Sequence, residues 1–209
     1  MRWDKVKYAT IFLVIIHLVG ILGLSIEGFR PYFVGLTPVT LIISVIVLLF
    51  FHKDWSQSFY ICISLLFFLG WGIEVLGVST GVVFGQYQYT GVLGVRLLDT
   101  PLMIGVNWLM LIYMVGVIFK MFDNIVIKAI AGASLLVLLD LFIEPVAIGL
   151  RFWVWEGDQV PILNYVAWFL ISFVLLIVFY LFPFKKENSI AFRLFSIQFL
   201  FFVILSLIL

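Results

Sequence analysis

Seven long apolar runs constrain this chain more than any other feature of its sequence. A helix that crosses a bilayer needs about 20 mainly apolar residues, and runs of this kind occupy residues 8–26, 33–51, 58–80, 99–121, 125–149, 162–182 and 190–209. They show no two-residue alternation, which argues against a β-barrel. Only 11% of the residues are charged, against roughly 25% in soluble domains. The sequence therefore predicts an all-α fold class, a polytopic membrane bundle of about seven transmembrane helices forming a single domain, residues 1–209.

Lysine and arginine are unevenly distributed between the two ends of these runs. Cytoplasmic loops of membrane proteins carry an excess of both residues. If the N-terminus is cytoplasmic, only Arg30, Arg96 and Arg151 of the 12 lysines and arginines fall on the outer side. We therefore expect a cytoplasmic N-terminus, a C-terminus on the far side and residence in the cell inner (plasma) membrane. The run at 8–26 is long and lacks a clear cleavage site, so we expect a first membrane helix there rather than a signal peptide.

Several kinds of site are not expected. The single cysteine, Cys62, lies in an apolar run, and no histidine lies near the acidic residues of the runs, so we expect no metal site. No Gly-rich phosphate loop and no basic cluster for nucleic acid is present. Seven helices would also fit a rhodopsin, but the last run, residues 190–209, contains no lysine that could form a Schiff base with retinal. Polar residues do not form a stripe across the whole membrane, as a channel or transporter would prefer, and this pattern indicates a closed pocket entered from the lipid.

Polar side chains converge on one membrane level, near the outward ends of the apolar runs. An ionisable side chain inside a bilayer costs several kcal/mol unless it is paired or hydrated, which makes it a functional candidate. The residues that share this level are Glu74, Asp99, Asp140, Glu144 and Asn164.

Glu74 and Asp99 each have a structural interpretation beside the functional one. Glu74 could pair with Arg96 or Arg151 at the end of its helix. Asp99 precedes a proline-opened helix, which is an ordinary N-terminal signal. Both are nevertheless candidate catalytic residues.

Asp140 and Glu144 are four residues apart and are expected to share one helix face. Two carboxyl groups this close tend to hold one proton between them, which suits a general acid. Glu144 could instead meet water, because Pro145 follows it and could break the helix. We take both as candidate catalytic residues.

Aromatic clusters follow the two acid-bearing runs at 58–80 and 125–149. Tyr87 lies 13 positions after Glu74, and Trp153 lies 13 positions after Asp140, which predicts a duplicated helix–loop–helix unit. Single rings could equally belong to an interfacial aromatic belt, and a buried amide could merely tie helices together. Glycines after Glu74 are expected to let the chain close over a pocket. The candidate substrate-binding residues are Trp71, Tyr87, Tyr89, Asn107, Trp108, Trp153, Trp155 and Asn164.

Four ordered blocks of the chain resemble a known family. The blocks are E-x-x-G-x-x-T-G-x-x-F-G-x-Y-x-Y, D-T-P-L-x-I-G-x-N-W, D-x-x-x-E-P-V-A-x-x-x-x-F-W-x-W-E and P-x-x-N-Y-x-x-W, which together extend over 71–168. They are similar to the membrane carotenoid biosynthesis proteins, specifically the carotenoid hydratases of the bisanhydrobacterioruberin hydratase and gamma-carotene hydratase type.

The resemblance implies addition of water to the terminal double bond of an acyclic carotenoid end, giving a tertiary alcohol without a cofactor. Protonation of such an alkene needs a desolvated acid, and the resulting carbocation needs aromatic faces. We assign Asp140 as the proton donor, coupled to Glu144 or Glu74, with Asn107 and Asn164 orienting water. Expected partners are a lycopene- or gamma-carotene-like substrate, membrane lipid and other carotenoid enzymes.

Two alternatives remain open at the level of the sequence. An end-group cyclase begins with the same protonation, but a neighbouring double bond captures the cation in a dry pocket. A non-enzymatic carotenoid or lipid binder would tolerate the loss of both Glu74 and Asp140.

Overall fold

The computed structural model describes residues 2–209 of the chain, with side chains from residue 4 onward, as a bundle of α-helices. Six of these helices are long and apolar enough to cross a membrane, and α3 is an apolar helix of only 14 residues. The prediction of a polytopic helical membrane bundle is confirmed. In chain order the helices are α1 (Arg2–Ser25), α2 (Arg30–Gly35), α3 (Thr37–Phe50), α4 (Gln57–Thr80), α5 (Leu102–Ile118), α6 (Ile125–Gly149), α7 (Ile162–Leu181) and α8 (Ala191–Ile208).

The second predicted run, residues 33–51, is divided between two helices. Helix α2 ends at Gly35 and α3 begins at Thr37, with Leu36 between them. Pro38 lies in the first turn of α3, where its missing N–H and fixed φ are tolerated; further into a continuous helix it would remove a hydrogen bond. The proline therefore starts a new helix.

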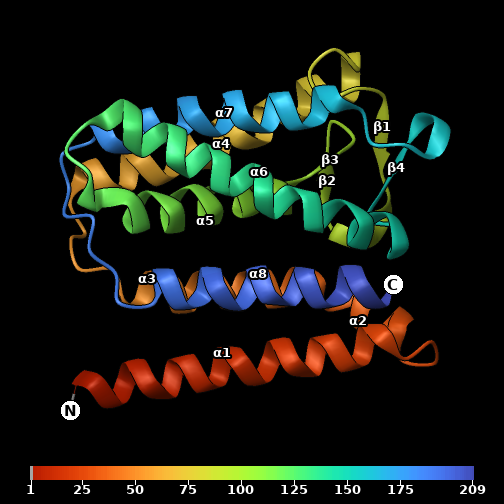
Figure 1. Cartoon of the computed structure of the whole chain (residues 1–209), viewed down its shortest axis with the longest axis horizontal. Coiled ribbons are helices and arrows are strands. Elements are labelled where there is room, and N and C mark those ends of the chain that lie inside the picture. Colours follow the sequence, from red (N-terminus) through yellow and green to blue (C-terminus); the bar gives the residue numbers. More distant parts are fainter. Residues whose placement is uncertain (1) are drawn as a thin grey trace.

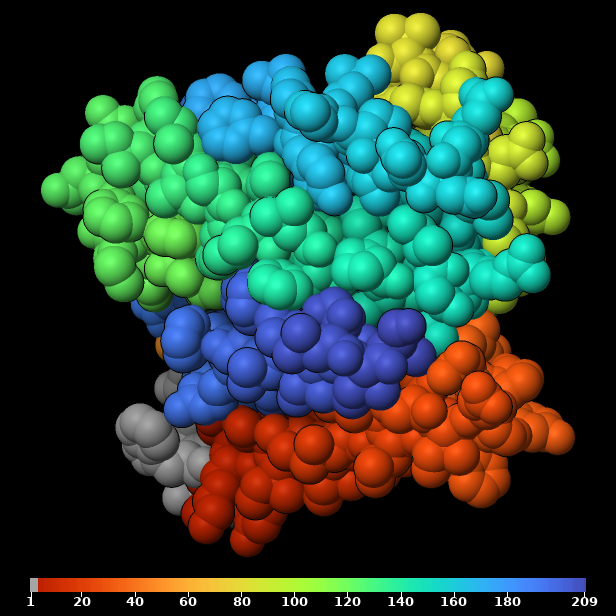
Figure 2. All heavy atoms as spheres, turned by 45° about the vertical axis from the view of Figure 1, so that its right-hand side comes forward, coloured from red at the N-terminus to blue at the C-terminus, as the bar shows by residue number. Residues whose placement is uncertain are grey.

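Helices α4 to α7 form one side of the bundle, α3 and α8 lie next to it, and α1 covers the opposite face (Figure 1). The most deeply buried of the six spans is α5, which packs against α4, α8, α7, α3 and α6. Figure 2 shows the red surface of α1 far from the yellow connection that follows α4. Helix α1 begins at one end of the bundle and α8 finishes at the other (Figure 1).

Two short β-ladders lie at the end of the bundle where α4 and α6 finish and where α5 and α7 begin (Figure 1). Strand β1 (Tyr87–Tyr89) pairs antiparallel with β4 (Trp153–Trp155), and β2 (Arg96–Leu97) pairs antiparallel with β3 (Thr100–Pro101). Single turns of 3₁₀ helix lie at this end at η1 (Gly91–Leu93) and η3 (Glu156–Asp158). Another, η2 (Phe119–Met121), directly follows α5. The strands are too short to show a period in the sequence, and we did not predict them.

The opposite end is closed by polar contacts around His52, between α3 and α4. His52 Nε2 donates to the Asp54 carbonyl at 2.7 Å, so Nδ1 is the acceptor for the Tyr113 hydroxyl, also at 2.7 Å. The same hydroxyl oxygen accepts from Asn188 Nδ2 at 3.1 Å. Burial lowers the pKa of His52, partly offset by the Asp54 carbonyl, and the ring therefore stays neutral in its one hydrogen-bonded tautomer.

Candidate active site

The pairing of β1 with β4 brings the two halves of the predicted site together. The register places Tyr87 opposite Trp155 and Tyr89 opposite Trp153. Each strand follows an acid-bearing helix, so the order helix, strand, helix occurs in α4–β1–α5 and again in α6–β4–α7. An antiparallel pair has a local two-fold axis, which relates the two segments at this point. The common order is in line with the predicted duplication, which stays a prediction.

Glu74 is buried near the end of α4 and accepts three hydrogen bonds from neutral donors. The Tyr87 and Tyr89 hydroxyls donate to Oε2 at 2.6 and 2.7 Å, and Trp108 Nε1 donates to Oε1 at 2.9 Å. The alternative that Glu74 pairs with Arg96 or Arg151 is wrong, because Arg96 donates to the Tyr89 carbonyl and both arginines are exposed.

A glycine lets β1 return over Glu74. A Cβ atom added at Gly77 would lie 2.5 Å from the Phe84 ring and 3.2 Å from the Tyr87 hydroxyl. Gly81 then ends α4 with φ at +66°, a left-handed conformation that costs glycine little. The expected role of the glycines after Glu74 thus has a direct steric basis.

Glu144 and Asp140 lie one turn apart on α6, and both are buried. Glu144 Oε2 accepts from Trp155 Nε1 at 2.8 Å and from Trp153 Nε1 at 3.1 Å. Asn164 Nδ2 bridges the two acids, donating to Asp140 Oδ2 at 2.9 Å and to Glu144 Oε1 at 3.2 Å. The predicted common face is confirmed. Asp140 Oδ1 is buried without any hydrogen-bond partner.

The two tyrosines of β1 act as hydrogen-bond donors. Burial raises the pKa of Tyr87, and the negative charge of Glu74 raises it further. Burial and the same carboxylate hold the pKa of Tyr89 well above its usual range. Both phenols therefore stay protonated, and the donors around Glu74 are uncharged.

A small cavity separates the Glu74 side of the site from the Glu144 side. Its water-accessible volume is about 40 Å³, and one water needs roughly 10–15 Å³ by this measure, so it has room for about three water molecules. Aromatic rings form much of its wall, with Trp108 stacked on Trp168 at 4.5 Å between centroids and Tyr87 beside Trp155 at 4.9 Å. The lining residues are Glu74, Phe84, Tyr87, Tyr89, Ile104, Asn107, Trp108, Ile143, Glu144, Trp153, Trp155, Asn164 and Trp168.

Three predicted residues do not line this cavity. Asp99 is exposed in the turn between β2 and β3 with φ at +59°, and α5 begins only at Leu102, so the prediction that Asp99 opens the helix is wrong. Trp71 turns aside to donate to the Thr100 carbonyl at 3.4 Å. Asp140 lies behind the wall, in contact with Asn164.

Trp168 is a site residue that we did not predict. It lies four residues after Asn164 on α7, stacks on Trp108 and forms part of the wall. The i, i+4 spacing from Asn164 was the available signal, because residues at this spacing share a helix face. Phe84, Ile104 and Ile143 complete the wall. Phe84 and Ile104 belong to the motif blocks, whereas Ile143 carries no signal beyond apolarity.

The chain was compared with known proteins. Residues 34–209 match the family described as "Carotenoid biosynthesis protein". A relative named bisanhydrobacterioruberin hydratase, from Haloarcula japonica, is 27% identical over 184 residues, which cover 79% of this chain and 62% of the relative. The chain thus spans less than two thirds of that relative's length. No solved structure matches the chain. Because the family match extends over most of the sequence, and as the four motif blocks predicted, the chain belongs to the carotenoid biosynthesis protein family.

Proposed function

We propose that the protein hydrates the terminal double bond of an acyclic carotenoid end-group to a tertiary alcohol. The observation that carries the proposal is a water-sized cavity with two carboxyl groups on its wall and aromatic rings between them. The name of the Haloarcula japonica relative supports the same reaction class. Hydration needs a held water, which the polar side chains of the wall, Glu74, Asn107 and Glu144, can hydrogen-bond, whereas end-group cyclisation needs a dry pocket.

The hydrogen-bond donors indicate which acid holds the proton at rest and which acid transfers it to the alkene. Glu144 receives two indole N–H groups and one amide N–H, which stabilise a carboxylate. Asp140 receives one amide N–H and has a second oxygen without a partner, and an ionised carboxyl left so poorly solvated is costly. We place the resting proton on Asp140. Since Asp140 lies behind the wall, it supplies the proton and Glu144 presents it to the alkene.

The remaining steps follow from ordinary alkene hydration. The proton adds to the less substituted carbon of the double bond and leaves a tertiary carbocation, which the faces of Trp108, Trp168 and Trp155 stabilise. Water adds to the cation, and Glu74 accepts the proton that the bound water loses. Three donors disperse the negative charge of Glu74 before this transfer. Proton relay back to Asp140 completes the cycle, with water as the only co-reactant.

The two asparagines have different roles in this scheme. The amide nitrogen of Asn164 is committed to Asp140 and Glu144, so Asn164 positions the acids. Asn107 lines the cavity, and we assign it to orient water. Trp71 and Asp99 are outside the proposed machinery, because Trp71 donates to the Thr100 carbonyl and Asp99 is exposed in the turn between β2 and β3.

Pigment analysis tests the proposal. The chain and its Glu144→Gln, Asp140→Asn and Glu74→Gln variants are expressed in a host that makes lycopene or gamma-carotene, and extracts are examined by chromatography and mass spectrometry. We expect a product heavier by one water with an unchanged polyene, and roughly a hundredfold loss in each variant. Glu156→Gln is the matched control, because Glu156 is exposed. Protein in the membrane is measured in every strain.

Two results would contradict the proposal. A product of unchanged mass and shorter-wavelength absorption would identify a cyclase. Unchanged pigment from wild-type protein that is present in the membrane would favour a carotenoid or lipid binder.

A further inference from the structure

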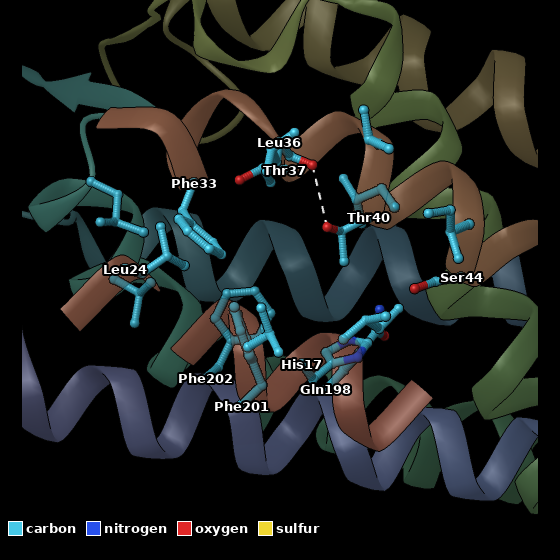
Figure 3. Close-up of a pocket in the computed structure, with 18 of the residues that line it drawn as sticks. His17, Leu24, Phe33, Leu36, Thr37, Thr40, Ser44, Gln198, Phe201 and Phe202 are labelled. Atoms are coloured by element: carbon cyan, nitrogen blue, oxygen red, sulfur yellow. Dashed lines mark hydrogen bonds between the residues drawn. The ribbon is translucent and has the colours of Figure 1, made fainter. Parts of the chain in front are cut away.

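A second, larger cavity lies on the other side of the bundle. It is enclosed by α1, α2, α3 and α8 and by the end of α6, and its water-accessible volume is about 310 Å³ (Figure 3). Ile15 and Val19 of α1 and Val39 of α3 line it while being 52%, 48% and 50% exposed. The cavity therefore opens between α1 and α3, on the surface that a membrane-embedded bundle turns towards lipid. Most of its lining side chains are aliphatic or aromatic.

Polar side chains lie inside this apolar cavity, two of them with unsatisfied atoms. Ser44 is fully buried on α3, and its hydroxyl oxygen has no hydrogen-bond partner. Gln198 is 5% exposed on α8; its nitrogen contacts Met110 Sδ at 3.7 Å, and its Oε1 has no partner. Ser44 projects from α3 towards the side chains of His17 and Gln198 (Figure 3). Unsatisfied buried polar atoms are rare in native proteins and call for an explanation.

The unsatisfied atoms specify the chemistry of the ligand group that would suit this cavity. Gln198 Oε1 can only accept, so it requires a donor. His17 Nδ1 lies 2.8 Å from the Leu13 carbonyl, to which it must donate, so Nε2 of the neutral ring is also an acceptor. The Ser44 hydroxyl can donate or accept. A ligand hydroxyl, which donates once and accepts, satisfies Gln198 and Ser44 together, whereas a pure hydrocarbon satisfies neither.

We propose that this cavity binds a long-chain isoprenoid alcohol, with its hydroxyl group between Ser44 and Gln198 and its chain leaving between α1 and α3. The hydroxyl group and the long apolar chain follow from the cavity itself. The isoprenoid character of the chain rests on the proposed function, whose product is an isoprenoid alcohol. This site is separate from the acid-lined cavity, with which it shares no lining residue.

Photolabelling tests the proposal on the purified full-length protein in lipid nanodiscs. A diazirine analogue of geranylgeraniol is crosslinked, and the labelled peptides are mapped by mass spectrometry. We expect labels on α1, α3 and α8. Geranylgeraniol should compete roughly five- to tenfold better than the C20 hydrocarbon that lacks the hydroxyl, the ratio given by one hydrogen bond of about 1–1.5 kcal/mol. Equal competition, or labels confined to other helices, would overturn the proposal.

Variants separate the polar contact from simple hydrophobic partition. Ser44→Ala and Gln198→Leu should each reduce the preference for the alcohol and leave binding of the hydrocarbon unchanged. Ser172→Ala is the matched control, because Ser172 is also a buried serine whose hydroxyl has no partner, but it lies on α7 away from this cavity. Retention of the preference in both test variants, or its loss in the Ser172 control, would contradict the assignment.

Further competitors identify the alcohol and keep this proposal distinct from the proposed function. Competition by octadecanol equal to that of geranylgeraniol would overturn the isoprenoid assignment. Competition by a hydroxylated carotenoid would identify the site as one for the reaction product, and competition by geranylgeraniol alone would identify a membrane isoprenoid alcohol. These measurements need no turnover, so an inactive protein that still prefers the alcohol would contradict only the proposed function.

Discussion

Replacement of Gly70 by alanine should disturb the active site, because Gly70 lies on α4, the helix that carries Glu74. Gly70 lies one turn before Glu74 on α4, where α5 approaches closely. A Cβ atom at this position would lie 2.4 Å from Trp108 Cβ and 2.7 Å from Trp108 Cγ. These atoms are at the root of the tryptophan side chain, so a rotamer change cannot relieve the overlap. Trp108 or the whole of α5 must move, and the hydrogen bond from Trp108 Nε1 to Glu74 Oε1, now 2.9 Å, is lost or lengthened.

Gly72 provides a matched control two residues further along the same helix. An added Cβ atom there meets nothing within 4 Å. Both alanine variants gain about 0.5–1 kcal/mol of helix propensity, and this gain cancels when they are compared with each other. The difference that remains is the overpacking penalty of about 1–3 kcal/mol. Gly70→Ala should therefore be less stable than Gly72→Ala by that amount.

Reversible unfolding in mixed micelles, followed by circular dichroism, measures this difference. Product formation in the carotenoid-producing host should fall by at least about tenfold in Gly70→Ala, as expected for the loss of a hydrogen bond to a charged group, and should be unchanged in Gly72→Ala. Equal stability and equal activity of the two variants would refute the close approach of α4 and α5 and, with it, the positioning of Trp108.

Three further changes test separate contacts. Trp155→Phe keeps the ring but removes a donor from Glu144, and pigment analysis should show product formation reduced by about tenfold or more; an unchanged rate would mean that this donor is dispensable. Since burial lowers the pKa of His52 below 6.5 in the folded protein, its contribution to stability is present above pH 6.5 and is lost as the pH falls towards the folded pKa. Thermal unfolding between about pH 5 and 8 should show that stability falls towards acid pH more steeply in wild type than in His52→Asn. The same pH dependence of stability in both proteins would contradict this role of His52. Thr90→Val removes the hydrogen bond to the Arg151 carbonyl, 2.7 Å long, and should lower the free energy of unfolding by about 1 kcal/mol, with Thr40→Val as a control whose own bond stays within one exposed helix start.

The helices were predictable because hydrophobic length alone specifies a membrane span. Every predicted run contains helix, and the ends differ by at most three residues except at the start of α1, which begins at Arg2 instead of residue 8. The break in the run 33–51 depended on Pro38, which was visible in the sequence. Its effect is not specified by sequence alone, since a proline inside a membrane run can equally mark a kink.

The acids of the site and the side chains around them were predictable, but which donor serves which acid was not. Buried carboxyl groups are costly in an apolar helix, so the sequence alone identifies candidate catalytic residues at Glu74, Asp140 and Glu144. The meeting of the Glu74 half with the Glu144 half depends on how two three-residue strands pair across 63 residues of intervening chain, from Tyr89 to Trp153. Only the pairing register decides that the tyrosines and tryptophans meet at one cavity, and nothing local in the sequence specifies it.

Neutral donors around the two glutamates are what a site for reversible proton transfer requires. A buried arginine beside Glu74 would hold the carboxylate in its charged form, because protonation would strand an unpaired cation in an apolar interior. Phenol, indole and amide groups leave no such charge behind when the acid takes up a proton. A phenol can even reverse its role and accept from a protonated carboxyl, whereas an indole cannot. Glu74 with two tyrosines therefore tolerates both protonation states more easily than Glu144 with two tryptophans. This asymmetry supports Glu74 as the group that receives the proton lost by water.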